Sequence, residues 1–252
     1  MEAVHNVATG KFLSVTNLTV SFDGFKAVDD LNFSVDEGEL RVVIGPNGAG
    51  KTTLLDMICG KTKPTNGSIK FRDLELTQMI DYQITRAGVG RKFQTPSIYE
   101  DLTVLENLEI AYPEKRSVTG SLFFKRTAEI TEKIETVAGQ IFLTEELGTK
   151  SGLLSHGQKQ WLEIGLSLMQ DPELLLLDEP VAGMSVRERE QTAELLKSVS
   201  KGRSLVLIEH DMAFVELIAQ TVTVLHQGKL LAEGSMQEVQ SDERVIEVYL
   251  GN

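Results

Sequence analysis

Two short stretches of this chain combine residue types that handle phosphate. The first runs Gly45-Pro46-Asn47-Gly48-Ala49-Gly50-Lys51-Thr52 and matches the pattern G-x-x-x-x-G-K-[ST] without a mismatch. Its glycines allow backbone N–H groups to curl around an oxyanion, and the helix expected after it points its positive end at the same place. Lys51 can reach the outer phosphates of a nucleotide, and the Thr52 hydroxyl can ligate Mg²⁺. The glycine spacing differs from G-x-G-x-x-G, which disfavours a dinucleotide site.

The second stretch places two acidic residues, Asp178 and Glu179, directly after the four leucines Leu174–Leu177. At the end of a buried strand, Asp178 can hold Mg²⁺ through water, and Glu179 can orient or deprotonate an attacking water. Downstream of a phosphate loop, the pair predicts a nucleoside triphosphatase. The chain lacks the N-K-x-D motif expected of a GTPase and the arginine-rich lid usual in a small-molecule kinase.

Strands and helices must position these residues, and the chain alternates between them. Compact apolar runs predict buried parallel strands at 40–44, 174–177 and 204–208. Helices are expected at 52–59, after the phosphate loop, and at 187–199. Short strands are predicted in 12–35, and a hairpin is predicted from 221–225 and 229–232. This alternation predicts a mostly parallel sheet with covering helices.

The region from about Thr95 to Leu154 has a different, helical pattern. Its clearest amphipathic piece is Glu129–Ile141, and the stretch 113–120 is expected to be a loop. We interpret this region as a helical subdomain inserted in the α/β core.

Composition excludes several function classes. The 252 residues carry a formal net charge of −12, whereas a nucleic-acid binder is usually basic. The acidic balance also argues against direct docking on anionic lipid. A single cysteine, Cys59, cannot form an internal disulfide, which favours a reducing cytosol. No apolar run approaches the ~20 residues of a membrane-spanning helix, and the N-terminus lacks a secretory signal. Any service to a membrane would therefore pass through a protein partner.

A third motif points to a family. The run Leu154-Ser155-His156-Gly157-Gln158 resembles the LSGGQ signature of ABC ATPases. Ser155 and Gln158 have capping-box spacing, which predicts a helix start and a second anion site at its N-terminus. In the family, this signature closes over a nucleotide held by the opposite subunit. The resemblance thus implies a head-to-tail dimer with two ATP molecules at the interface. His156 departs from the usual glycine.

Other positions match the family in order. Gln94 resembles the glutamine that contacts Mg²⁺ or water and senses the membrane partner, and His210 resembles the switch histidine at the γ-phosphate. Phe22 resembles the aromatic residue that stacks on adenine, although a core phenylalanine is an alternative. Ser185 stands where the family usually has an aspartate that couples the two subunits. The interval between Lys51 and Asp178 suits a transporter ATPase and leaves no room for the long coiled coils of DNA-repair and chromosome ATPases.

The resemblance covers nearly the whole chain and implies an α/β P-loop NTPase fold of the ABC ATPase type. The expected division has a mostly parallel core with an N-terminal antiparallel β subdomain (about 12–94 and 160–252) and an inserted helical subdomain (about 95–159). The expected cofactors are ATP and Mg²⁺. The expected catalytic residues are Glu179, His210 and Gln94, and the expected metal ligands are Thr52, Gln94 and Asp178. The residues expected to bind the nucleotide are Phe22, Gly45, Asn47, Gly48, Ala49, Gly50, Lys51, Thr52, Thr53, Ser155, Gly157 and Gln158.

Within the family, the segments 22–28 and 245–251 resemble the branched-chain amino-acid and urea uptake group. The segments 154–165 and 179–185 look most like the urea-type ATPase, so urea or a short amide is the expected cargo, with branched-chain amino acids as the alternative. The implied partners are two transmembrane permease subunits, a second ATPase subunit (identical or related) and, indirectly, a solute-binding protein outside the cell. The implied location is the cytoplasmic face of the inner membrane. A soluble ABC ATPase acting on translation or DNA is a less favoured alternative.

Overall fold

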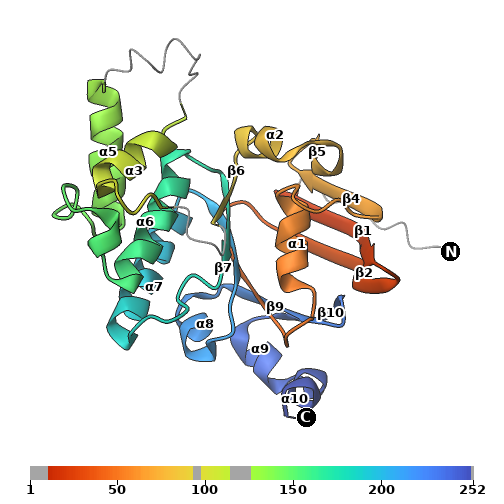
Figure 1. The fold of residues 1–252 in the computed structure, drawn as a ribbon. Coiled ribbons are helices and arrows are strands. Elements are labelled where there is room, and N and C mark those ends of the chain that lie inside the picture. Colours follow the sequence, from red (N-terminus) through yellow and green to blue (C-terminus); the bar gives the residue numbers. More distant parts are fainter. Residues whose placement is uncertain (1–10, 93–97, 114–125, 251–252) are drawn as a thin grey trace.

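The computed structural model describes residues 11–92, 98–113 and 126–250. Two sheets organise these residues (Figure 1). The larger has six strands in the order β10-β9-β3-β8-β7-β6, and the smaller has four in the order β2-β1-β4-β5. The strands are β1 (Leu13–Phe22), β2 (Phe25–Val35), β3 (Leu40–Ile44), β4 (Asn66–Phe71), β5 (Leu74–Glu75), β6 (Val89–Lys92), β7 (Leu174–Asp178), β8 (Ser204–Ile208), β9 (Thr221–His226) and β10 (Lys229–Gly234).

Parallel pairing makes up most of the larger sheet. Strand β3 pairs in parallel with β8 and β9, and β7 pairs in parallel with β8 and β6. Only the hairpin partner β10 runs antiparallel, on β9. The three central strands β3, β7 and β8 are buried at every position, as expected of a parallel sheet that is covered on both faces.

Helices cover the larger sheet and connect its strands. They are α1 (Lys51–Ile58), α2 (Asp81–Arg86), α3 (Val104–Ala111), α5 (Ala128–Gln140), α6 (His156–Met169), α7 (Val186–Ser200), α8 (Met212–Ile218), α9 (Met236–Ser241) and α10 (Glu243–Leu250), with single 3₁₀ turns at Leu76–Gln78 and Ser151–Leu153. Figure 1 shows α3, α5 and α6 grouped on one side of the sheet, whereas α1 lies on the other side beside the small antiparallel sheet.

Alternate side chains of each central strand enter two different hydrophobic cores. Val42 and Leu175 pack in a core with α3, α5, α6, α7 and α8, whereas Val43 and Leu176 pack in a core with α1 and the antiparallel sheet. The two-residue period of a strand places neighbours on opposite faces, so one sheet separates two cores. Among the described residues no helix has the length and apolar character needed to cross a bilayer.

The architecture predicted from the sequence is confirmed. A mostly parallel sheet with covering helices, an antiparallel sheet built from the N-terminal strands and a group of helices between β6 and β7 are all present. The phosphate-loop helix begins at Lys51, one residue earlier than expected, and the predicted C-terminal hairpin is β9–β10.

Candidate nucleotide-binding site

The phosphate loop joins β3 to α1 and lies at the carboxyl edge of the parallel sheet. Gly50 is the N-cap of α1 and has no side chain that could cap the helix, so the first backbone N–H groups of α1 remain available to an anion. Gly48 and Gly50 both have positive φ angles, of 79° and 98°. Glycine alone adopts such angles without strain, and successive N–H groups can therefore turn toward one point.

Two glycines of this loop are fixed by neighbouring backbone as well as by φ. A Cβ atom on Gly45 would lie 2.2 Å from the carbonyl oxygen of Leu225 in β9. A Cβ on Gly50 would lie 2.5 Å from the carbonyl oxygen of Ala27 in β2. The loop is thus clamped between the two sheets, and a side chain at either position would displace main chain.

Lys51 folds back onto its own loop. Its Nζ donates hydrogen bonds to the carbonyl oxygens of Gly45 (2.7 Å) and Pro46 (3.0 Å). Burial lowers the pKa of Lys51, and the carboxylates of Glu179 and Asp178 counteract part of that shift. The ammonium is therefore close enough to Asp178 and Glu179 to be stabilised by their charge, and Lys51 and Glu179 line the same cavity.

A cavity of about 400 Å³ opens in front of the loop. Phe22 and Phe25 are cross-strand partners at the ends of β1 and β2, joined by a two-residue turn, so their rings lie on the same face of the hairpin. Both are exposed, which excludes the interpretation of Phe22 as a core residue and leaves its ring available for stacking on a base. The cavity is lined by Phe22, Phe25, Ala27, Asn47, Gly48, Ala49, Gly50, Lys51, Thr52, Thr53 and Glu179.

Asp178 is buried with no neutralising contact at hydrogen-bond distance. Within the described part of the chain, neither carboxylate oxygen has a hydrogen-bond partner, and the nearest guanidinium nitrogen, Nη2 of Arg91, is 3.9 Å away. Burial raises the pKa of Asp178, while the Thr52 hydroxyl and Arg91 counteract part of the rise. A buried carboxylate with open acceptor positions beside a threonine hydroxyl suits a hard divalent cation, so the donor set fits Mg²⁺.

Glu179 has an unusual backbone conformation. Its φ of +47° is left-handed, which is rare and strained for a non-glycine residue. The strain is held by the sheet, because the Glu179 N–H donates to the carbonyl of Ile208 at 3.0 Å. Its Oε1 lies 3.4 Å from Nδ1 of His210, which follows β8. Two of the three predicted catalytic side chains are therefore brought together, and both are partly open to solvent.

A buried acid that the sequence analysis did not single out supports these two residues. Glu209 is 1% exposed, and its carboxylate accepts the N–H groups of Val181 (3.3 Å) and His210 (3.1 Å). Burial raises the pKa of Glu209, and these hydrogen bonds counteract part of the rise. The signal that could have identified it is an acidic residue directly after the apolar strand 204–208.

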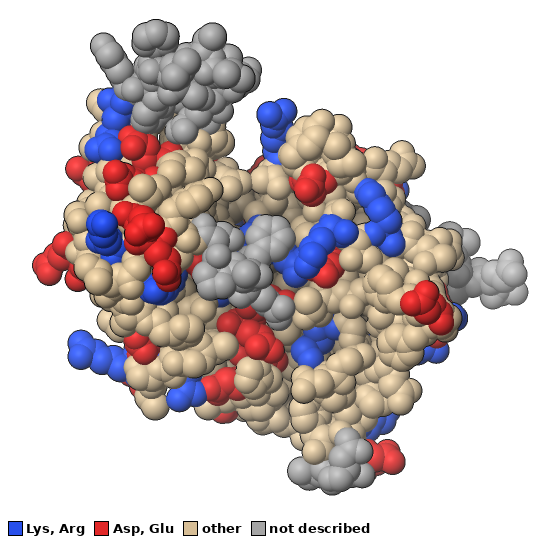
Figure 2. All heavy atoms as spheres, in the orientation of Figure 1, with Lys and Arg blue, Asp and Glu red and all other residues tan. Residues whose placement is uncertain are grey.

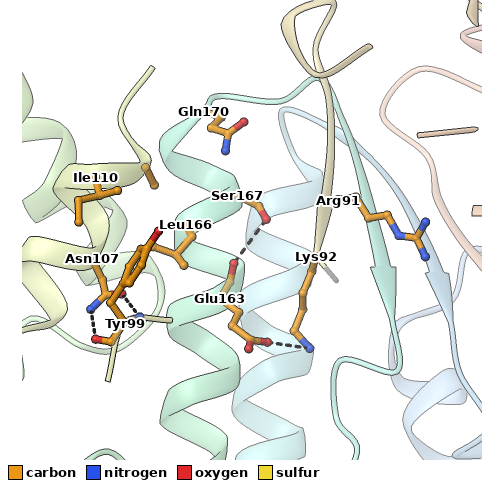
Figure 3. A pocket seen from close by; sticks show the side chains of 10 residues that line it. Arg91, Lys92, Tyr99, Asn107, Ile110, Glu163, Leu166, Ser167 and Gln170 are labelled. Atoms are coloured by element: carbon orange, nitrogen blue, oxygen red, sulfur yellow. Dashed lines mark hydrogen bonds and ion pairs between the residues drawn. The ribbon is translucent and has the colours of Figure 1, made fainter. Parts of the chain in front are cut away.

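Gln94 lies outside the described residues, so its predicted role is not located. The strand that leads toward it ends at Lys92, which is buried against α6 (Figure 3). Lys92 Nζ lies 3.3 Å from the carboxylate of Glu163 and also donates to Gln160. Burial lowers the pKa of Lys92, and Glu163 counteracts this. This buried ion pair fastens the edge strand of the sheet to the helix that carries the signature.

The signature lies at the N-terminus of α6. Ser155 is the N-cap and forms a capping box with Gln158: the Ser155 hydroxyl accepts the Gln158 N–H at 3.2 Å, and the Gln158 side chain accepts the Ser155 N–H at 2.9 Å. Farther along α6, Trp161 is buried and donates its indole N–H to Thr192 of α7 at 2.8 Å. It also meets Phe142 edge to face at 5.5 Å.

The signature and the phosphate loop of one chain do not share a cavity. None of the described residues that line the cavity of the phosphate loop belongs to the signature segment 154–158. Figure 1 places α6 and α1 on opposite sides of the strands β6 and β7. Basic and acidic side chains are interspersed over the face shown in Figure 2, without a continuous basic surface among the described residues there.

Comparison with known proteins agrees with this geometry. The family model described as "ABC transporter" matches residues 28–182, and the one described as "Branched-chain amino acid ATP-binding cassette transporter" matches residues 229–252. The chain is 35% identical to the high-affinity branched-chain amino acid transport ATP-binding protein LivG of Escherichia coli, over 95% of this chain and 97% of that protein. It is 34% identical to the corresponding protein BraF of Pseudomonas aeruginosa, over 95% and 97%.

Solved structures resemble the fold over the same length. A nucleotide-free ATP-binding cassette from an ABC transporter gives a TM-score of 0.85 at 32% identity, covering 96% of this chain and all of that one (100%). The ADP conformation of an ATP-binding cassette of an ABC transporter gives a TM-score of 0.85 at 31% identity, covering 97% of this chain and 100% of that one.

Proposed function

The chain belongs to the ATP-binding subunits of ABC transporters, and from this premise we propose that it powers an importer of branched-chain amino acids. It is an ATP hydrolase of the ABC type. The observation that carries the proposal is the full-length similarity to LivG and BraF, together with the separate match of the C-terminal segment 229–252. Urea was the cargo predicted from the segments 154–165 and 179–185, and the relatives named above support the amino acids instead.

In the proposed reaction, the phosphate loop binds the triphosphate through the open N–H groups at the start of α1. Lys51 exchanges its two bonds to loop carbonyls for the β- and γ-phosphates, because charged oxygens are better acceptors than amide carbonyls. Thr52 and Asp178 would hold Mg²⁺, together with Gln94. When bound, the metal neutralises charge that develops on the phosphates.

Glu179 orients the attacking water and accepts its proton. The neighbouring His210, at 3.4 Å, would contact the γ-phosphate and hold the carboxylate in place. Phe22 stacks on the adenine, and we extend this role to Phe25, because the two rings lie on the same face of the hairpin in front of the loop.

We also propose that the signature residues Ser155, Gly157 and Gln158 act on the nucleotide of a second ATPase subunit. The absence of these residues from the lining of this chain's own cavity supports a site shared between two subunits. The second subunit is an identical or related copy. The division into a core (about 12–94 and 160–252) and a helical subdomain (about 95–159) belongs to the same proposal.

Two transmembrane permease subunits would receive the motion at the cytoplasmic face of the membrane, and a solute-binding protein would deliver the cargo from outside. The contact is proposed on the segment 94–108, which includes Ile98, Tyr99 and Leu102; Gln94 and Pro96, expected on the same surface, lie outside the described residues. Tyr99 is 58% exposed, and its backbone N–H is held by Asn107 at 2.8 Å, so an aromatic ring is presented on a fixed main chain (Figure 3).

Uptake by source cells tests the proposal. Labelled leucine and labelled urea are supplied to cells with the wild-type chain, without it, and with Glu179→Gln as a matched inactive control. We expect leucine uptake to fall in both deficient strains and urea uptake to stay constant. A selective loss of urea uptake would support urea, the cargo predicted from the signature region. No change in the uptake of leucine or of urea would contradict the importer proposal.

A further inference from the structure

A side-chain contact joins the signature to the segment that follows Glu179. His156 is the first residue of α6, and its Nε2 lies 3.0 Å from the carbonyl oxygen of Ala182. A carbonyl can only accept a hydrogen bond, so Nε2 carries the proton and donates. The usual glycine of the family could not make this contact, because it has no side chain.

The imidazole also lies against the main chain of Gly183. This glycine has a φ of +72°, and a Cβ atom on it would lie 3.1 Å from Nε2 and 3.3 Å from Cδ2 of His156. The ring and the glycine therefore fit each other: the glycine leaves the space that the ring fills.

Two hydrogen bonds lead from His156 to Glu179. The first is the bond to the Ala182 carbonyl, and the second runs from the Ala182 N–H to the carbonyl of Glu179 at 3.3 Å. The same short segment is also held by the buried Glu209, whose carboxylate accepts the N–H of Val181. A displacement of the signature thus reaches the backbone of Glu179 through a single residue, Ala182.

A second side chain strengthens the connection. Glu188 in the first turn of α7 accepts the N–H (2.9 Å) and the hydroxyl (2.7 Å) of Ser185, and its other oxygen is 3.5 Å from the Ser155 hydroxyl. A Cβ on Gly157 would lie 2.3 Å from that oxygen, so the carboxylate rests directly on the signature backbone. Ser185, which stands where the family usually has aspartate, is thus tied to the signature of its own chain.

We propose that His156 is a positioning residue that links the signature to Glu179 within one chain. When the signature binds the nucleotide of the second subunit, the link fixes the position of the segment after Glu179. The signature and the catalytic glutamate of one chain therefore respond together. The inference rests on the proposed function, because the signature gains its role only from that second nucleotide. His156 is assigned this role through its contact with the Ala182 carbonyl and not through a contact with the reacting groups.

Two substitutions separate the hydrogen bond from the bulk of the ring. His156→Phe keeps a planar ring but removes the donor, whereas His156→Gln places an amide N–H at a similar reach. We expect His156→Phe to lower kcat about fivefold, the factor given by the net contribution of one hydrogen bond, with KM changed less than twofold. His156→Gln should retain at least half of the wild-type kcat. Binding of a fluorescent ATP analogue by the isolated subunit and the unfolding temperature should be unchanged in both.

A second pair of variants tests the contact from its other side. Gly183→Ala should lower kcat in the wild-type background, where the new methyl group presses on the ring, and should lower it less in His156→Gly, which has the family's usual residue. Coupling of this kind is expected only for residues in contact. If His156→Phe folds poorly, the double-mutant cycle of Gly183→Ala and His156→Gly, together with His156→Gln, still tests the proposed link.

The outcomes distinguish the two levels of the argument. Wild-type kcat in His156→Phe, equal damage in His156→Phe and His156→Gln, or additive effects of Gly183→Ala and His156→Gly would each overturn the link. A wild-type protein without ATP hydrolysis, or a Glu179→Gln variant that does not dimerise with ATP, would instead defeat the proposed function.

Discussion

The phosphate loop and the signature each lie at a helix N-terminus, the end of a helix that favours anions, yet they are built in different ways. The loop is fixed by main chain: side chains at Gly45 or Gly50 would meet carbonyl oxygens of the flanking strands. The signature is fixed by side chains, since the nearest atoms to a Cβ on Gly157 belong to the Glu188 carboxylate. Backbone neighbours cannot yield without unfolding part of a sheet, whereas a carboxylate can change its rotamer.

This difference assigns the two ends different tasks. A site that must bind a triphosphate in the same geometry in every cycle gains from a rigid loop. The loop is already ordered in the folded protein, so binding does not cost the entropy of ordering it. A site that must engage and release a nucleotide on another subunit gains from contacts that can be exchanged. Four experiments test this contrast, from the largest expected effect to the smallest.

Proton transfer from the attacking water should depend on Glu179, which lies beside the rigid phosphate loop, and not on the signature. Glu179→Gln should lower ATP turnover by about 10²- to 10⁴-fold, the contribution of a general base, while both phosphate-binding ends stay intact. An ATP-dependent dimer should therefore accumulate, which sedimentation or size-exclusion chromatography with and without ATP can measure. Turnover near the wild-type rate would remove Glu179 from its role, and a variant that stays monomeric would show that the signature end does not engage.

The buried ion pair of Lys92 and Glu163, which joins β6 to the signature helix α6, should contribute to the stability of the whole fold. Lys92→Met should lower the free energy of unfolding by about 3 kcal/mol, because the Glu163 carboxylate loses the buried ammonium that faces it. Lys92→Met combined with Glu163→Leu should recover most of the loss. Urea denaturation of the wild type, Lys92→Met and the double variant measures this. Equal stability of Lys92→Met and the wild type would mean that the two sides are joined elsewhere.

The glycines give the most direct comparison. Gly50→Ala should destabilise the fold by about 2 kcal/mol, since the methyl group meets the Ala27 carbonyl at an unfavourable φ, and should abolish nucleotide binding by the isolated subunit. Gly157→Ala should leave both properties nearly unchanged and lower only dimer-dependent turnover.

Thermal unfolding and titration with a fluorescent ATP analogue check both glycine variants. Glu188→Ala in the Gly157→Ala background is the control that makes room for the new methyl group, and it should restore part of the turnover. A Gly157→Ala protein as unstable as Gly50→Ala would contradict the contrast.

The smallest effect concerns pH. Burial raises the pKa of Asp178, so between the ordinary aspartate pKa and this raised value the folded state binds more protons than the unfolded state. Stability of the metal-free protein should fall as the pH rises through this interval. Asp178→Asn should reduce that fall, leaving the part that comes from the raised pKa of Glu209. It should also unfold at a slightly higher temperature at neutral pH and lose the extra stabilisation by Mg²⁺ with ATP. Parallel melting curves with and without Mg²⁺ check this, and identical pH profiles would contradict it.

Much of this site could be predicted because several of its parts, the phosphate loop first, are formed by residues that are consecutive in the sequence. The run Gly45–Thr52, the carboxylates after Leu174–Leu177 and the capping-box spacing of Ser155 and Gln158 each depend on local geometry, so short patterns are sufficient. The fold followed from the alternation of apolar runs and helical segments, which the two-faced burial of β3, β7 and β8 explains.

Contacts between distant residues could not be predicted in this way. Nothing in the sequence placed Lys92 beside Glu163 or His156 beside Ala182, since those pairs depend on how α6 packs against the sheet and the segment after β7. Phe25 was missed because its role comes from cross-strand pairing with Phe22, which fixes the side on which its ring lies. The left-handed backbone of Glu179 is likewise set by strand neighbours.

Trp161 is the single tryptophan of the chain and lies within α6, buried between Phe142 and Thr192 of α7. Its indole hydrogen bond and its edge-to-face contact both depend on the spacing of the helices around it. The protein therefore carries a built-in fluorophore less than one helical turn after Gln158, the last residue of the signature. Its emission wavelength and lifetime can follow, without any label and in real time, how this end of the molecule rearranges during each catalytic cycle.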